Sequence, residues 1–139
     1  PHRVKNIRRI GNVVFYDDSK GTNVGATVAA LNGMRQPVVL IAGGDGKGQS
    51  FAPLKPAVDA ACKAVLLVGR DASLVARGIA GTRAAVEEVT TLERAVARAV
   101  VLSPACASLD QFASYVQRGQ RFAELVRVAL REARPCAST

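Results

Sequence analysis

Asp17-Asp18-Ser19-Lys20-Gly21-Thr22-Asn23 is the stretch from which the architecture of this 139-residue chain can be worked out. An apolar run at 13–16 precedes it and predicts a strand, and residues 24–31 follow with apolar side chains at helical spacing. The heptapeptide is therefore expected to be a strand-to-helix turn, where the first N–H groups of a helix are unpaired and bind anions. Thr22 and Asn23 are also ordinary helix caps, so capping alone remains an alternative.

Strands and helices are predicted to alternate along the rest of the chain. The predicted strands are 37–42, 64–68, 84–89 and 100–102, and the predicted helices are 24–32, 50–62, 72–79, 90–99 and 108–131. Residues 4–10 are expected to pair with 13–16 as a hairpin. The pattern predicts an α/β, Rossmann-like three-layer domain with a mostly parallel sheet and an N-terminal β-hairpin. In such a sheet the turns after the strands share one edge, where ligands bind.

Two helix starts have the spacing of a capping box, Thr90 with Glu93 and Ser108 with Gln111. The last helix is expected to bury one apolar stripe, with Gly119 as a possible break in the helix. The stripe consists of Leu109, Phe112, Val116, Phe122, Leu125 and Val126.

Two features suggest that residues are missing from the sequence. The chain begins at Pro1, and its only methionine is Met34, so we expect it to be a fragment of a longer protein. The helix that ends near Ala99 meets the strand at Val100 with no connecting loop, although such connections take about 2–6 residues. We therefore expect an omission between Ala99 and Val100.

Composition narrows the class of protein. The chain is 49% hydrophobic, which suits one layered core, and it contains no apolar run of membrane-spanning length and no visible signal peptide. Its three cysteines, Cys62, Cys106 and Cys136, and its single histidine, His2, lack metal-ligand spacing. We expect a cytoplasmic protein without a metal site or a disulfide framework.

The formal net charge of +8 raises nucleic acid as a partner. The basic residues are scattered, however, and aromatic residues make up only 4% of the chain, with no Trp. Arg127, Arg131 and Arg134 at helical spacing indicate a solvated face rather than a binding surface. We expect no nucleic-acid or membrane partner, a monomer, and an anionic substrate.

A second turn, Gly43-Gly44-Asp45-Gly46-Lys47-Gly48, resembles a phosphate loop only superficially. The G-x-x-x-x-G-K-[ST] pattern needs glycine at Ile41 and a hydroxyl residue at Gly48, and a dinucleotide fingerprint started at Gly44 fails at Gln49. What remains is a glycine-lined turn with the ammonium of Lys47, suited either to a ligand or to a tight bend with a solvated lysine.

A third turn, 103–108, offers the hydroxyl of Ser108 at a helix start. Cys106 in this turn has no nearby histidine, so a cysteine nucleophile is not favoured. The three turns together can gather Thr22, Lys47 and Ser108 with helix N-termini around one crevice suited to carboxylates. No nucleophile–base pair is visible, which indicates a carboxylate-binding half-site rather than a complete active site.

Residues 17–23, 43–48 and 102–112, in this order, resemble the C-terminal part of the Mur ligases. Among these ligases, D-S-K-G-T-N is specific for the members that add D-glutamate to UDP-N-acetylmuramoyl-L-alanine in peptidoglycan precursor synthesis. The resemblance implies that residues 1–134 form the amino-acid-binding C-terminal domain and 135–139 a frayed tail. It also implies that the N-terminal and central ATPase domains are absent from this chain.

The resemblance further implies the chemistry of an ADP-forming amide ligase that serves cell-wall synthesis, and with it cell shape and division. In that reaction ATP phosphorylates the carboxylate of the nucleotide substrate, and the amine of D-glutamate attacks the acyl phosphate to form an amide, ADP and phosphate. ATP, Mg2+ and UDP-N-acetylmuramoyl-L-alanine would bind through the other domains. The isolated domain is expected to bind no metal or cofactor and to be inactive.

Residue roles carry over from the resemblance by matched position. Thr22 and Lys47 would hold the α-carboxylate of D-glutamate. Ser108, with the backbone near Leu109 and Tyr115, would hold its side-chain carboxylate. These two groups of residues make up the expected D-glutamate site.

Three further residues complete the site implied by the resemblance. Lys20 would help to position the substrates, so that Lys20 and Lys47 are the expected catalytic residues. Arg3 and Asp18 would lie toward ATP at the boundary between domains.

Two other interpretations remain open. The chain can be a stand-alone α/β module that binds a small dicarboxylate, or a basic interaction domain, and calorimetry with D-glutamate and with nucleic acid would separate these. The other interpretation, half of a nucleotide-dependent oxidoreductase, is disfavoured by the incomplete glycine fingerprint.

Overall fold

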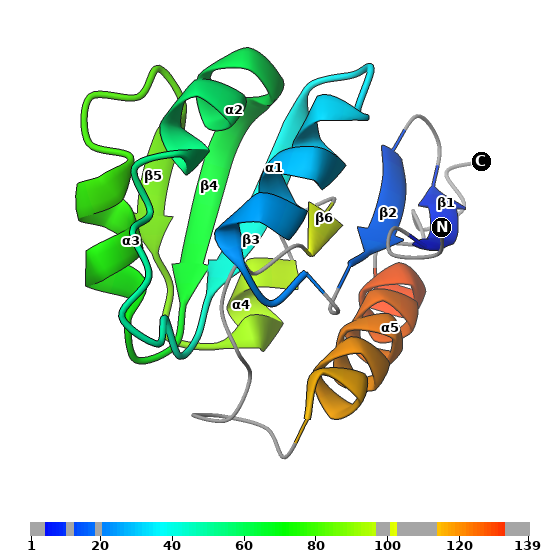
Figure 1. Ribbon diagram of the computed structural model, residues 1–139. Coiled ribbons are helices and arrows are strands. Elements are labelled where there is room, and N and C mark those ends of the chain that lie inside the picture. Colours follow the sequence, from blue (N-terminus) through cyan, green and yellow to red (C-terminus); the bar gives the residue numbers. More distant parts are fainter. Residues whose placement is uncertain (1–4, 11–12, 19–20, 97–100, 103–113, 133–139) are drawn as a thin grey trace.

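The computed structural model describes residues 5–10, 13–18, 21–96, 101–102 and 114–132 (Figure 1). Within these residues strands and helices alternate as the sequence predicts. The elements are β1 (Lys5–Ile10), β2 (Val13–Asp17), α1 (Val24–Asn32), β3 (Val38–Gly43), α2 (Leu54–Ala61), β4 (Cys62–Val68), α3 (Ala72–Gly78), β5 (Ala85–Glu88), α4 (Leu92–Val96), β6 (Val101–Leu102) and α5 (Tyr115–Glu132).

The strands form one sheet in the order β1-β2-β6-β3-β4-β5. β1 and β2 pair antiparallel as a hairpin, and every other neighbouring pair is parallel. The arrows of β2, β3, β4 and β5 point the same way in Figure 1. The predicted mostly parallel sheet with an N-terminal hairpin is therefore confirmed, and the carboxyl ends of its parallel strands share one edge.

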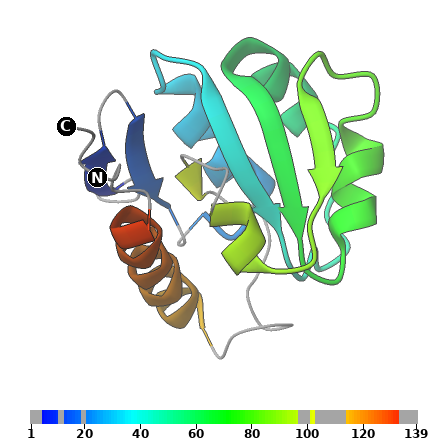
Figure 2. The ribbon, with the colours of Figure 1, turned by 180° about the vertical axis from the view of Figure 1, so that it is seen from behind.

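Helices cover both faces of the sheet. The helices α1, α2 and α3 lie on the face seen in Figure 1, and α4 lies in front of the sheet when the molecule is viewed from behind (Figure 2). All six residues of β3 are buried. Leu40 packs in the core under α1–α3, whereas Val39 and Ile41 pack with Leu92 of α4 and Phe122 of α5. This alternation explains why β3 appears in the sequence as an unbroken apolar run.

Prolines determine where α2 begins. The helix predicted from Ser50 begins only at Leu54, after Pro53 with φ −65°. Pro56 is the third helical residue, where a backbone N–H has no partner within the helix. Both prolines therefore lie in or before the first turn, as the sequence predicts.

The predicted capping box of Thr90 with Glu93 is wrong. The N–H of Val89 still donates to the carbonyl of β4 residue Leu67 at 2.8 Å, so the chain stays tied to the sheet beyond the end of β5. The helix α4 consequently begins at Leu92, two residues after the predicted start at residue 90. Thr91 rather than Thr90 caps it, with Oγ1 accepting from the N–H of Arg94 at 3.3 Å.

The apolar stripe predicted for α5 is partly correct. Phe122 and Val126 are fully buried, and Leu125 packs against the same core. Val116 is 49% exposed, because six residues separate it from Phe122 and place it about 240° away around the helix. The predicted break at Gly119 is also wrong, since α5 runs through this buried position without interruption.

Several sequence predictions lie outside the described residues. These are the Ala99–Val100 junction, the capping box of Ser108 with Gln111, and the stripe residues Leu109 and Phe112. None of the helices in the described part of the chain is long and apolar enough to cross a membrane.

Candidate functional site

Three neighbouring strands lead into the three sequence motifs. β6 lies between β2 and β3, with Leu102 paired to Asp17 on one side and to Ile41 on the other. The strands are parallel, so the segments that follow them leave from the same edge of the sheet. The connections from β3 and β6 lead to helices on opposite faces, and such a reversal is where open α/β sheets bind ligands.

The first motif forms a tight turn between β2 and α1. The N–H of Gly21 donates to the carbonyl of Asp18 at 2.7 Å, and the Asp18 side chain is buried. Asn23 caps the helix, since its Oδ1 accepts from the N–H of Ala26 at 2.8 Å. The cap is therefore Asn23 rather than Thr22, and the half-buried Thr22 side chain stands outside the capping arrangement.

The second motif follows β3 as a loop with unusual backbone angles. Gly43 has φ +121°, and a Cβ there would collide with the carbonyl oxygen of Val68. Lys47 has φ +49°, the only positive φ of a non-glycine among the described residues. Its N–H donates to Oδ1 of Asp45 at 3.0 Å, and its side chain is exposed. The loop therefore projects the Lys47 ammonium into solvent from a strained backbone.

A side-chain hydrogen bond joins the first two motifs. Oε1 of Gln49 accepts from the N–H of Val24 at 3.0 Å, which satisfies one of the unpaired donors at the start of α1. Gln49 is two residues beyond Lys47, and Val24 is two residues beyond Thr22. The parallel strands place Thr22 and Lys47 at the same edge of the sheet, and this contact joins the segments that carry them.

We predict that Gln49→Leu lowers the free energy of unfolding by about 1 kcal/mol, because it removes the acceptor for the Val24 N–H at nearly constant size. Gln49→Glu should keep wild-type stability, since its carboxylate can accept the same bond beside the positive end of α1. Urea denaturation of both variants provides the measurement. Equal stability of Gln49→Leu and wild type would show that the contact is not a stabilising tether.

The described residues cover only part of the predicted site. Asp18, Thr22 and Lys47 are described, as is the backbone of Tyr115, the first residue of α5. The remaining predicted residues lie outside the described part; they are Arg3, Lys20, Ser108 and Leu109. No group of three or more His, Cys, Asp or Glu side chains within the described ranges is arranged to hold a metal ion.

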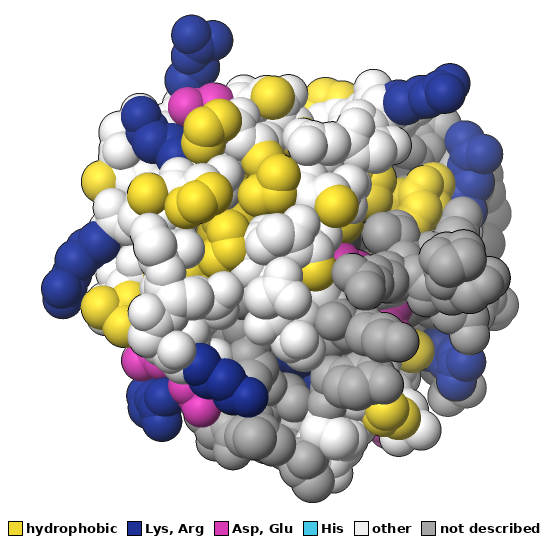
Figure 3. All heavy atoms as spheres, viewed as in Figure 1, with side chains coloured by type: hydrophobic (Ala, Val, Ile, Leu, Met, Phe, Trp, Pro, Cys, Tyr) yellow, Lys and Arg dark blue, Asp and Glu magenta, His cyan; other side chains and the backbone are white. Residues whose placement is uncertain are grey.

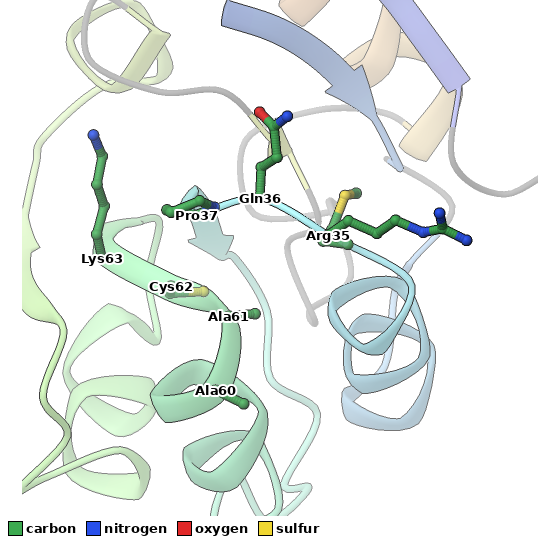
Figure 4. Close-up of a pocket in the computed structure, with 8 residues that line it drawn as sticks. Arg35, Gln36, Pro37, Ala60, Ala61, Cys62 and Lys63 are labelled. Carbon is green, nitrogen blue, oxygen red and sulfur yellow. The ribbon is translucent and has the colours of Figure 1, made fainter.

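A shallow hollow of about 380 Å³ lies at the opposite edge of the sheet (Figure 4). Its lining comes from the segment between α1 and β3 and from the junction of α2 with β4: Met34, Arg35, Gln36, Pro37, Ala60, Ala61, Cys62 and Lys63. Arg35 and Lys63 extend in different directions (Figure 4). Burial raises the pKa of the Cys62 thiol to about 12, so this thiol is not a nucleophile at neutral pH. The hollow is separate from the motif edge.

These observations define a class, a three-layer α/β domain in which the three motif segments follow neighbouring parallel strands at one edge of the sheet. The sequence pattern of the family described as "Mur ligase, glutamate ligase domain" matches residues 2–107. The chain belongs to this family. The resemblance inferred from the three motifs is therefore confirmed at the level of the family.

Curated relatives carry the name UDP-N-acetylmuramoylalanine--D-glutamate ligase. The protein of Chromobacterium violaceum is 54% identical over 134 residues, which cover 90% of this chain and 30% of the relative. That of Aromatoleum aromaticum is 53% identical over 137 residues, 91% of this chain and 29% of the relative. That of Nitrosomonas europaea is 47% identical over 141 residues, 95% of this chain and 30% of the relative. The chain spans about 30% of the length of these relatives.

Proposed function

We propose that this chain is the D-glutamate-binding domain of an ATP-dependent ligase that joins D-glutamate to UDP-N-acetylmuramoyl-L-alanine. The names of the relatives support the activity, and their greater length supports a role as one domain of the enzyme. The domain boundary at residue 134 and the tail at 135–139 belong to the same proposal. The proposal also states that the enzyme is cytoplasmic and monomeric and that it acts in peptidoglycan precursor synthesis.

The observation that carries the proposal is the hydrogen bond between Gln49 and Val24. It holds the loop of Lys47 against the turn of Thr22, on strands that flank β6. An ammonium, a hydroxyl and a helix N-terminus on one edge provide charge-assisted and neutral donors for a carboxylate. In the proposal Thr22 and Lys47 bind the α-carboxylate of D-glutamate.

The second carboxylate of D-glutamate needs a second group of donors. The proposal assigns it to Ser108 and to backbone N–H groups near Leu109 and Tyr115. The segment after β6 begins between the ends of β2 and β3, and this topology supports the assignment. Two separated anion sites favour a dicarboxylate over an amino acid with a neutral side chain.

The proposed role of this domain in the reaction is to hold the amine donor. ATP supplies the phosphoryl group that activates the carboxylate of the nucleotide substrate. The amine nitrogen of bound D-glutamate then attacks the acyl carbon, and the tetrahedral intermediate expels phosphate to form the amide. Lys20 positions the substrates, and Arg3 and Asp18 face ATP. Mg2+ and ATP belong to the remainder of the ligase. Catalysis by this domain is therefore catalysis by proximity.

The distribution of charge supports a small-molecule ligand. The Lys and Arg side chains of the described residues are spread over the face in Figure 3, most of them near its margin, and do not gather into one patch. A nucleic-acid surface usually collects its basic residues on one face or along one helix.

We predict that Thr22→Val in the complete ligase raises the KM for D-glutamate by about 5- to 150-fold, the cost of about 1–3 kcal/mol for an unsatisfied carboxylate oxygen. Thr22→Ser keeps the hydroxyl and should remain close to wild type. ADP release measured against D-glutamate concentration tests both variants. A wild-type KM in Thr22→Val would show that Thr22 does not bind D-glutamate. ADP release independent of D-glutamate would overturn the proposed function.

A further inference from the structure

The turn that leads into α3 makes two hydrogen bonds to the loop of Lys47. The N–H of Asp71 donates to the carbonyl of Gly44 at 3.0 Å, and its Oδ2 accepts from the N–H of Gly46 at 2.8 Å. Asp71 occupies the N-cap of α3 but makes no capping hydrogen bond with its side chain. Its carboxylate, which at this position would ordinarily accept from its own helix, is directed instead to the glycine loop.

Arg70 extends the same network to the residue between Gly44 and Gly46. Its Nη2 lies 2.6 Å from Oδ1 of Asp45 and 3.3 Å from Oδ2 of Asp71. The same Oδ1 of Asp45 accepts from the N–H of Lys47 at 3.0 Å. The contacts therefore reach Lys47 by two routes, through Gly46 and through Asp45.

The charge state of Asp71 suits this arrangement. The hydrogen bond from the Gly46 N–H, followed by that from Arg70, holds the pKa of the Asp71 carboxyl below its usual range. Arg70 is 62% exposed, so its ion pairs contribute little to stability by themselves. The contact that holds the loop is therefore the hydrogen bond from the Gly46 N–H to the Asp71 carboxylate.

Lys47 needs such support because of its backbone conformation. Its φ of +49° is in the left-handed region, which costs a residue with a Cβ about 1–2 kcal/mol. If the loop were released, Lys47 would relax to a negative φ and its side chain would leave in another direction. Residues that hold Gly46 and Asp45 in place therefore determine where the ammonium lies.

We propose that Asp71 is a positioning residue of the D-glutamate site, acting through Gly46 to fix the loop from which Lys47 reaches the ligand. The inference rests on the proposed function, in which Lys47 binds the α-carboxylate. It adds a residue from the turn between β4 and α3 to a site built by the three motif segments.

The test compares Asp71→Ala with a matched variant in the complete ligase. Asp71→Ala is expected to raise the KM for D-glutamate about tenfold, the ratio for the loss of one ordinary hydrogen bond, with the KM for the other substrates unchanged. Asp71→Asn keeps an oxygen that can accept from Gly46 and should restore most of the affinity.

Asp59 provides the control. Its Oδ1 accepts from Oγ1 of Thr82 at 2.5 Å and from the N–H of Arg83 at 3.0 Å, at the edge opposite the motifs. Asp59→Ala thus removes a carboxylate with a similar number of bonds and should leave the KM for D-glutamate unchanged. An equal rise in KM in Asp59→Ala and Asp71→Ala would overturn the positioning role, because it would reflect general destabilisation.

A double variant separates failure of this inference from failure of the proposed function. If Asp71 acts through Lys47, adding Asp71→Ala to Lys47→Ala should not raise the KM for D-glutamate further. Additive effects, or a wild-type KM in Asp71→Ala while Lys47→Ala is impaired, would overturn the positioning role alone. A wild-type KM in Lys47→Ala would instead overturn the role given to Lys47 in the proposed function.

Discussion

Lys47→Ala in the complete ligase is expected to raise the KM for D-glutamate about 100-fold, because a hydrogen bond to a charged group contributes about 1.5–3 kcal/mol. The Lys47 side chain is exposed, and within the described part of the chain no hydrogen bond or ion pair engages its ammonium. We also expect kcat to fall, because a loosely held amine spends less time within reach of the acyl phosphate. Initial rates at varied D-glutamate concentration, with the other substrates saturating, measure both effects.

Three control variants make the result specific. Lys47→Met keeps most of the length of the side chain without its charge and should resemble Lys47→Ala, whereas Lys47→Arg keeps the charge with a different geometry and should recover part of the loss. Lys63→Ala removes an exposed lysine from the opposite edge of the sheet and should behave as wild type. If Lys47→Ala and Lys63→Ala give the same KM, the ammonium of Lys47 does not bind the carboxylate.

The fold could be predicted from the sequence because its signals are local. Residues 37–42 form an apolar run, and β3 is buried at every position with side chains alternating between the two cores. The error at the start of α4, by contrast, arose from a contact between residues distant in the sequence. Thr90 and Thr91 are equally good caps, and only the hydrogen bond from Val89 to β4 determines which of them begins α4.

The motif residues could be predicted, but the contacts that hold them could not. In the sequence Gln49 stands out only as a mismatch to a fingerprint, and Arg70 and Asp71 match no motif. Each reaches a partner 25 residues upstream, with Gln49 bonded to Val24 and Asp71 to Gly46. Partners this distant leave no periodic pattern in the sequence.

The separation of 25 residues between Asp71 and Gly46 has a structural cause. Gly43 of β3 is in register with Val68 of β4, also 25 positions apart. Successive β-α units of equal length bring equivalent positions of their loops side by side, so that a side chain in one loop can bond the backbone of the preceding one. A polar side chain one β-α unit further along the chain than a glycine loop is the signal that could have indicated Asp71.

Gly43→Ala is expected to lower the free energy of unfolding by about 2–6 kcal/mol, since backbone strain and steric overlap each cost about 1–3 kcal/mol. Gly43 has φ +121°, a conformation that side chains with a Cβ rarely adopt. The added methyl group would also meet the backbone of Val68 in the adjacent strand, which cannot move aside like a flexible side chain. Because Gly43 ends β3 and opens the loop of Lys47, the same change should misplace the proposed carboxylate site.

Gly48→Ala separates strain from overlap. Gly48 also has a positive φ, +70°, but a Cβ there would have no atom within 4 Å. Its substitution should therefore cost only the left-handed penalty of about 1–2 kcal/mol. Urea denaturation of the two variants gives the comparison, and failure of Gly43→Ala to accumulate as folded protein while Gly48→Ala does so would support the same conclusion. Equal stabilities would mean that β3 and β4 separate at this end, so that the close approach at Gly43 does not fix the start of the Lys47 loop.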